Sequence, residues 1–89
     1  MNLTKDPNAI LDYIFDWSDW LDENETINSH QILVERGSVV VDSNERDGAQ
    51  ITVWLSGGND QETARVVCRI TTSAGRVDDR SLWLSIANR

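Results

Sequence analysis

The sequence has few of the residues from which catalytic and metal sites are built. Its 89 residues include one cysteine, Cys68, and one histidine, His30. A lone cysteine cannot form an intramolecular disulfide, and this pair is too small a ligand set for a structural zinc site. A Ser-His-Asp or Cys-His arrangement would have to be built on His30. We therefore expect no enzyme activity, no cofactor and no metal, with His30 structural or merely exposed and Cys68 buried.

Long apolar runs and basic residues are also scarce. No apolar stretch reaches the roughly 18 residues of a membrane helix, and residues 1–10 lack the apolar core of a secretion signal. Lys and Arg number 8 against 15 Asp and Glu, for a net charge of −7. Such an acidic chain lacks the counterion-release drive for nucleic-acid binding. We expect neither a membrane nor a nucleic acid as partner.

The negative charge is concentrated in the first third of the chain. Residues 1–30 contain one lysine and seven carboxylates, whereas residues 31–89 are nearly balanced. This asymmetry fits a solvated strand face, and it also fits a surface that seeks a basic partner.

The chain alternates short periodic runs with turn residues, which is typical of an all-β sandwich or barrel. We expect an N-terminal arm over residues 1–8, which contains the one proline, Pro7, and a single domain over residues 9–89. Strict alternation predicts half-buried strands within 62–72 and 80–87, joined as a hairpin through a tight turn at Gly75. Further strands are expected over 26–34, 38–42 and 51–55.

Residues 10–17 fit two periodicities. As a strand, the segment places Leu11, Tyr13, Phe15 and Trp17 on one face; as a helix, it would begin near Pro7 and present a stripe that includes Trp17. Its aromatic and β-branched content favours the strand, with a helical turn at Ser18–Asp22. The stretch 42–48 has only part of a calcium-loop pattern and is predicted to be a turn. The Gly57-Gly58 pair lacks the lysine of a phosphate-binding loop and is predicted to be an ordinary loop.

Trp54 and Trp83 alternate with the aliphatic residues of their strands, so they point out of a sandwich. Exposed indoles suggest a partner-facing patch, since monomers rarely leave apolar patches in water. The alternative is that Arg65 and Arg69 on the neighbouring strand stack on the indoles. The predicted partner-binding residues are Trp20, Trp54, Trp83, Arg65 and Arg69.

Several motifs resemble those of a family of small tailed-phage proteins. They are Asp12-Tyr13, Asp16-Trp17, the run Trp54 to Gly58, and the run Cys68 to Thr72 followed by Gly75-Arg76. The resemblance extends from residue 5 to about residue 87, and the family is known as the phage fibre–tail adaptor proteins.

The resemblance implies an immunoglobulin-like antiparallel β-sandwich of about six or seven strands and a non-enzymatic virion protein. Such a protein would be made in the cytoplasm of the bacterial host. It would dock tail fibres, tail or capsid proteins, in multiple copies per virion, where weak contacts gain from multivalency. A capsid decoration protein and a free-standing adhesion or carbohydrate-binding module are the alternatives.

Overall fold

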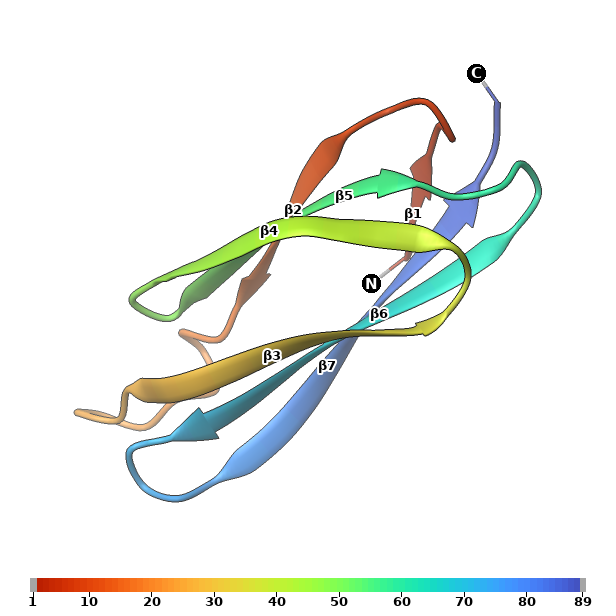
Figure 1. Cartoon of the computed structure of the whole chain (residues 1–89). Helices are drawn as coiled ribbons and strands as arrows, with labels where there is room; N and C mark the ends of the chain where they lie inside the picture. Colours follow the sequence, from red (N-terminus) through yellow and green to blue (C-terminus); the bar gives the residue numbers. More distant parts are fainter. Residues whose placement is uncertain (1, 89) are drawn as a thin grey trace.

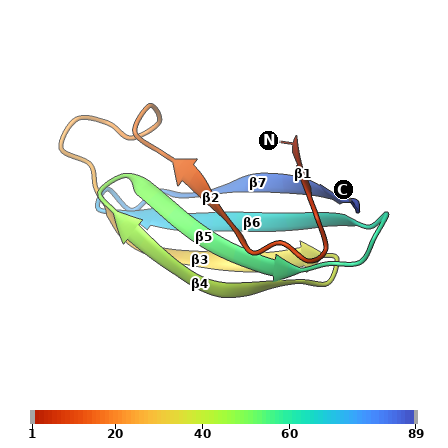
Figure 2. The ribbon, with the colours of Figure 1, turned by 90° about the horizontal axis from the view of Figure 1, so that it is seen from above.

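The computed structural model describes residues 2–88, which form seven strands in two packed sheets (Figure 1). The strands are β1 (Asn2–Lys5), β2 (Leu11–Asp16), β3 (Ile27–Arg36), β4 (Val39–Asp47), β5 (Gln50–Gly57), β6 (Thr63–Thr72) and β7 (Val77–Ile86). The described part of the chain has no helix, so none could cross a membrane. Figure 2 shows the two layers from above.

The strand order is that of an immunoglobulin fold. One sheet has the order β1-β7-β6-β3 and the other the order β2-β5-β4. If the strands are lettered A to G along the chain, the second sheet is B-E-D and the first contains G-F-C, as in immunoglobulin domains. The first strand departs from the constant-domain pattern because it pairs with β7, and in parallel; the other described pairs are antiparallel. The predicted all-β, immunoglobulin-like sandwich is confirmed.

The alternating apolar residues meet between the sheets as predicted. The core consists of Phe15, Trp17, Ile27, Val39, Ile51, Val53, Leu55, Ala64, Val66, Cys68, Ile70, Leu82, Leu84 and Ile86. The three inward residues of β5 are fully buried, whereas Trp54 between them is 41% exposed. One face of β5 therefore fills the core and the other faces solvent.

Residues 10–17 adopt the strand that their composition favours, and Phe15 and Trp17 point inward. The segment that follows makes a single hydrogen-bonded turn, at the place where a helical turn was predicted, and does not continue into a helix. The main-chain N–H groups of Trp20 and Leu21 both donate to the Trp17 carbonyl, at 3.0 and 3.1 Å, and the chain then continues irregularly to β3.

The prediction of a turn over 42–48 is wrong. Strand β4 continues to Asp47, and only Gly48 and Ala49 connect it to Gln50 of β5. The polar residues of this stretch have low intrinsic β propensity, but pairing with β5 outweighs that preference. Gly48, with φ of 61°, is the first central residue of the two-residue connection, where a hairpin favours glycine.

The N-terminal arm contributes β1 to the sandwich edge. Lys5, at the end of β1, is fully buried, and its Nζ donates to the main-chain oxygens of Gly57 at 2.7 Å and Asp6 at 3.0 Å. Burial lowers the pKa of Lys5, and the carboxylates of Asp6 and Asp42 oppose that shift. The aliphatic stem is thus buried while the ammonium group satisfies main-chain acceptors.

Gly75 and Gly37 both have a positive φ, but of the two only Gly37 lies close against another residue. Gly75, in the β6–β7 turn, has a φ of 82°, as predicted, and open space around it. Gly37, between β3 and β4, has a φ of 94°, and a Cβ placed there would lie 2.8 Å from the Ala64 Cβ and 2.9 Å from the Ala64 Cα. Gly37 therefore lets the β3–β4 corner pack directly against the start of β6.

Candidate docking surfaces

The outer face of the β2-β5-β4 sheet carries exposed apolar side chains around Trp54. Ile14 of β2 lies opposite Thr52, and Val40 of β4 lies opposite Ser56, so their partners are the outward neighbours of Trp54 along β5. Ile14 is 47% and Val40 54% exposed. Such diagonal neighbours lie within reach of a large aromatic side chain. We call this outer side of the sheet, marked by Ile14, Val40 and Trp54, the Trp54 face.

The charged side chains of the Trp54 face are acidic. The register places Asp12 of β2 opposite Trp54 of β5, and it places Glu45 and Asp47 of β4 further along the same face. None of these three forms a salt bridge within residues 2–88. The outward positions of the three strands, as far as they are described, contain no lysine or arginine.

Four charged side chains on the opposite sheet form two salt bridges within the chain. The Arg65 guanidinium lies over the Trp83 ring, 5.3 Å from its centroid, and its Nη1 is 2.9 Å from a Glu35 oxygen. Arg69 donates to both carboxylate oxygens of Asp79, at 2.8 and 3.0 Å, and this contact lowers the pKa of Asp79. Trp83 is therefore partly covered by Arg65, as the stacking alternative predicts, whereas Arg69 pairs with Asp79.

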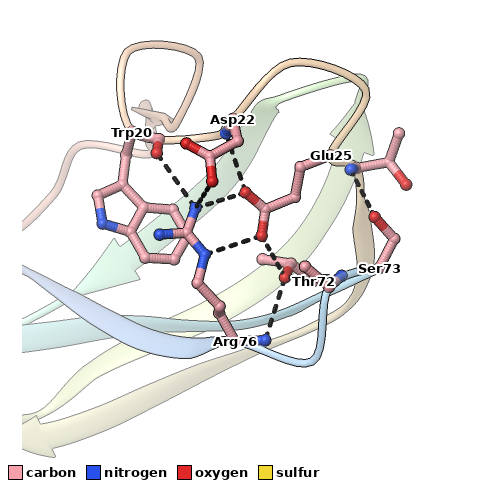
Figure 3. A network of polar contacts seen from close by, with 8 residues as sticks. Trp20, Asp22, Glu25, Thr72, Ser73 and Arg76 are labelled. Carbon is pink, nitrogen blue, oxygen red and sulfur yellow. Dashed lines mark hydrogen bonds and ion pairs between the residues drawn. The ribbon is translucent and has the colours of Figure 1, made fainter.

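Trp20 belongs to a polar network that joins the β2–β3 loop to the β6–β7 turn (Figure 3). The Arg76 guanidinium lies 3.9 Å from the centroid of the Trp20 ring and donates to the Trp20 carbonyl at 3.3 Å. It also donates to both carboxylate oxygens of Glu25. Thr72 Oγ1 donates to Glu25 at 2.6 Å. Beside this network, the Thr26 N–H donates to Ser73 Oγ at 3.0 Å.

Glu25 is the centre of this network. Its side chain is 3% exposed, and hydrogen bonds from Arg76 and Thr72 lower its pKa from 4.5 to about 2. Since Arg76 lies 51 positions away along the chain, the network fixes an irregular loop to a distant hairpin. We call Glu25, Thr72 and Arg76 the loop clamp; its partners within the chain give it a structural role.

A cleft of about 420 Å³ opens between the edge of β2 and β7. It is lined by Ile14, Phe15, Asp16, Arg80 and Ser81. The Arg80 guanidinium donates to the main-chain oxygen of Asp16 and lies 4.3 Å from the centroid of the buried Trp17 ring. Arg80 thus bridges the two sheets along this seam, and Ile14 connects the cleft to the Trp54 face.

The two residues with the most versatile side-chain chemistry are engaged structurally. Cys68 is buried as predicted, and burial raises the pKa of its thiol to about 11. His30 Nε2 lies 2.7 Å from Asn44 Oδ1, a contact that links β3 to β4 across the two sheets. Within residues 2–88, no group of three or more His, Cys, Asp or Glu side chains is placed to hold a metal ion.

The five predicted partner-binding residues do not form one surface. Trp54 lies on the outer side of one sheet, Trp83, Arg65 and Arg69 on the outer side of the other, and Trp20 in the β2–β3 loop. Of the three tryptophans, Trp54 is the one whose side chain belongs to the exposed large apolar set. Ile14 and Val40 were not predicted, although the alternation of β2 places Ile14 on the same side as Asp12 and Asp16.

Comparison with known proteins agrees with the motifs of the sequence. A search of curated proteins finds no match. The family model described as podophage GP4 fiber-tail adaptor protein gp77 matches residues 5–85, nearly the whole chain. This match confirms the resemblance seen in the motifs, and it makes the protein a phage structural protein and a virion component. The chain belongs to the podophage fibre–tail adaptor family.

Proposed function

We propose that this protein is a non-enzymatic adaptor that docks onto another virion protein, in the tail or the fibres, through the Trp54 face. It would be present in multiple copies per particle. The adaptor family supports attachment between virion components. The observation that carries the choice of surface is the exposed indole of Trp54, with Ile14 and Val40 beside it. The predicted alternatives, Trp20 and Trp83, already stack against arginines of the same chain.

The exposed part of Trp54 is large enough for a docking hot spot. A tryptophan presents about 250 Å² of surface, so the 41% that is exposed corresponds to about 100 Å². Burial at about 25 cal/mol per Å² would contribute about 2.5 kcal/mol. That free energy corresponds to a change of about seventyfold in a dissociation constant. Tryptophan is also among the residue types enriched at interface hot spots.

The experiment compares matched truncations on and off the Trp54 face. Val40 on the face and Val77 at the start of β7 are similarly exposed, at 54% and 59%. Trp54→Ala, Val40→Ala and Val77→Ala would be supplied from a plasmid to cells infected by phage with a disrupted copy of the gene. Copy number per purified particle and the melting temperature of each free protein would be measured.

We expect Trp54→Ala to reduce the copy number strongly and Val40→Ala to reduce it several-fold, since both remove apolar area from the interface. Val77→Ala should be incorporated normally. Normal incorporation of a folded Trp54→Ala protein would refute the proposed docking surface. A loss that only follows the melting temperature would show that Trp54 acts through stability.

A further inference from the structure

The two outer faces of the sandwich differ in whether their charged side chains form salt bridges within the chain. On the β1-β7-β6-β3 sheet, Arg65 pairs with Glu35 and Arg69 with Asp79. On the Trp54 face, Asp12, Glu45 and Asp47 have no salt-bridge partner among the described residues. The net negative charge of this face is therefore not neutralised by the chain itself.

These carboxylates lie beside the apolar residues that would dock. Asp12 is the cross-strand neighbour of Trp54, and Glu45 lies opposite Thr52, which is also the cross-strand partner of Ile14. A partner that covers Trp54 and Ile14 would thus remove water from one or both carboxylates. A carboxylate that loses water without gaining a partner is costly.

The cost of desolvating these carboxylates determines which kind of partner surface can cover the Trp54 face. A neutral apolar surface would leave Asp12 and Glu45 desolvated and unpaired. A second copy of the same face would bring like charges together, which is also unfavourable. A surface with lysine or arginine around an apolar site would satisfy both the indole and its acidic neighbours, and charge complementarity of this kind accelerates association.

We infer that the surface docked by the Trp54 face is a basic protein surface, with lysine or arginine side chains placed to meet Asp12 and Glu45. This inference rests on the proposed docking function. It assigns the partner's chemistry and gives Asp12 and Glu45 a role in binding.

A charge series tests the sign of the partner's surface. The neutralising variant Asp12→Asn/Glu45→Gln and the reversing variant Asp12→Lys/Glu45→Lys change the Trp54 face. The controls Asp19→Asn/Glu23→Gln and Asp19→Lys/Glu23→Lys make the same net-charge changes at two exposed residues of the β2–β3 loop. Each variant would compete with tagged wild-type protein, supplied equally in infected cells, and mass spectrometry would give the incorporation ratio in purified particles.

For a basic partner, the neutralised face should lose about fivefold in incorporation relative to its matched control, and the reversed face should lose more. If the neutralised face is incorporated as well as its control, or better, the partner surface is neutral and the inference is wrong. Improved incorporation of the reversed face would indicate an acidic partner, such as a second copy of this face, and would also overturn it. Melting temperatures of the four variants verify that each is folded.

The two proposals fail in different ways. Normal incorporation of folded Trp54→Ala removes the docking surface itself. A strong Trp54→Ala defect combined with equal incorporation of the face and loop charge variants would keep the docking surface and remove only its basic partner.

Discussion

The close packing of Gly37 against Ala64 gives the most direct quantitative test of the fold. Gly37→Ala places a methyl group 2.8 Å from the Ala64 Cβ and forces alanine into a backbone with φ of 94°. The left-handed conformation costs about 1–2 kcal/mol for a residue with a Cβ. Overpacking against a buried, well-packed neighbour adds about 1–3 kcal/mol. The expected loss in the free energy of unfolding is therefore about 2–5 kcal/mol.

Gly75→Ala is the matched control, because its φ of 82° is also positive but nothing lies within 4 Å of the added Cβ. It should cost only the backbone term, about 1–2 kcal/mol. Both substitutions restrict the unfolded chain similarly, so this effect cancels in the comparison. Urea unfolding followed by tryptophan fluorescence measures both values. Equal losses would show that the β3–β4 corner is not packed closely against Ala64.

Three further outcomes are expected. The stabilisation from Glu25 should be complete above pH 4.5, its ordinary pKa, and lost as pH falls through about 2. Scanning calorimetry from pH 2 to 7 should show that Glu25→Gln has a lower melting temperature than wild type at neutral pH and a smaller fall in melting temperature on acidification. Cys68, with a pKa of about 11, should react with a thiol reagent at about pH 8 much more slowly in native than in unfolded protein, and rapid native labelling would contradict its burial. Trp83→Ala should lower the melting temperature by removing the ring under Arg65 while leaving incorporation unchanged; a folded variant absent from particles would make Trp83 a docking residue.

Most strands were predictable because each has one buried and one solvated face. The alternation in β6 and β7 reports this difference directly, and glycine at position 75 marks the turn between them. The end of β4 was missed because Asp42–Asp47 has neither apolar alternation nor β propensity; its strand conformation comes from pairing with β5.

The site was predictable only in part, for a similar reason. Alternation showed that Trp54 points outward, but whether an outward ring is covered depends on neighbours from other strands. Arg65 reaches Trp83 from β6, and Arg76 reaches Trp20 from the β6–β7 turn. Val40 lies in a run of three valines that has no alternation, so its exposure became apparent only from the sheet.

The parallel pairing of β1 with β7 has a mechanical consequence. Asn2 lies beside Trp83 and Lys5 beside Ile86, so the two strands run in the same direction. Tension that pulls residue 2 and residue 88 apart along the strand direction would act along this ladder and load its hydrogen bonds in shear. Bonds in shear must yield together, whereas bonds at a hairpin pulled open yield one after another. Resistance to forced unfolding is a matter of the unfolding rate rather than of equilibrium stability. The short first strand, held by the buried Lys5, would therefore slow the unfolding of the sandwich when it is pulled along this direction.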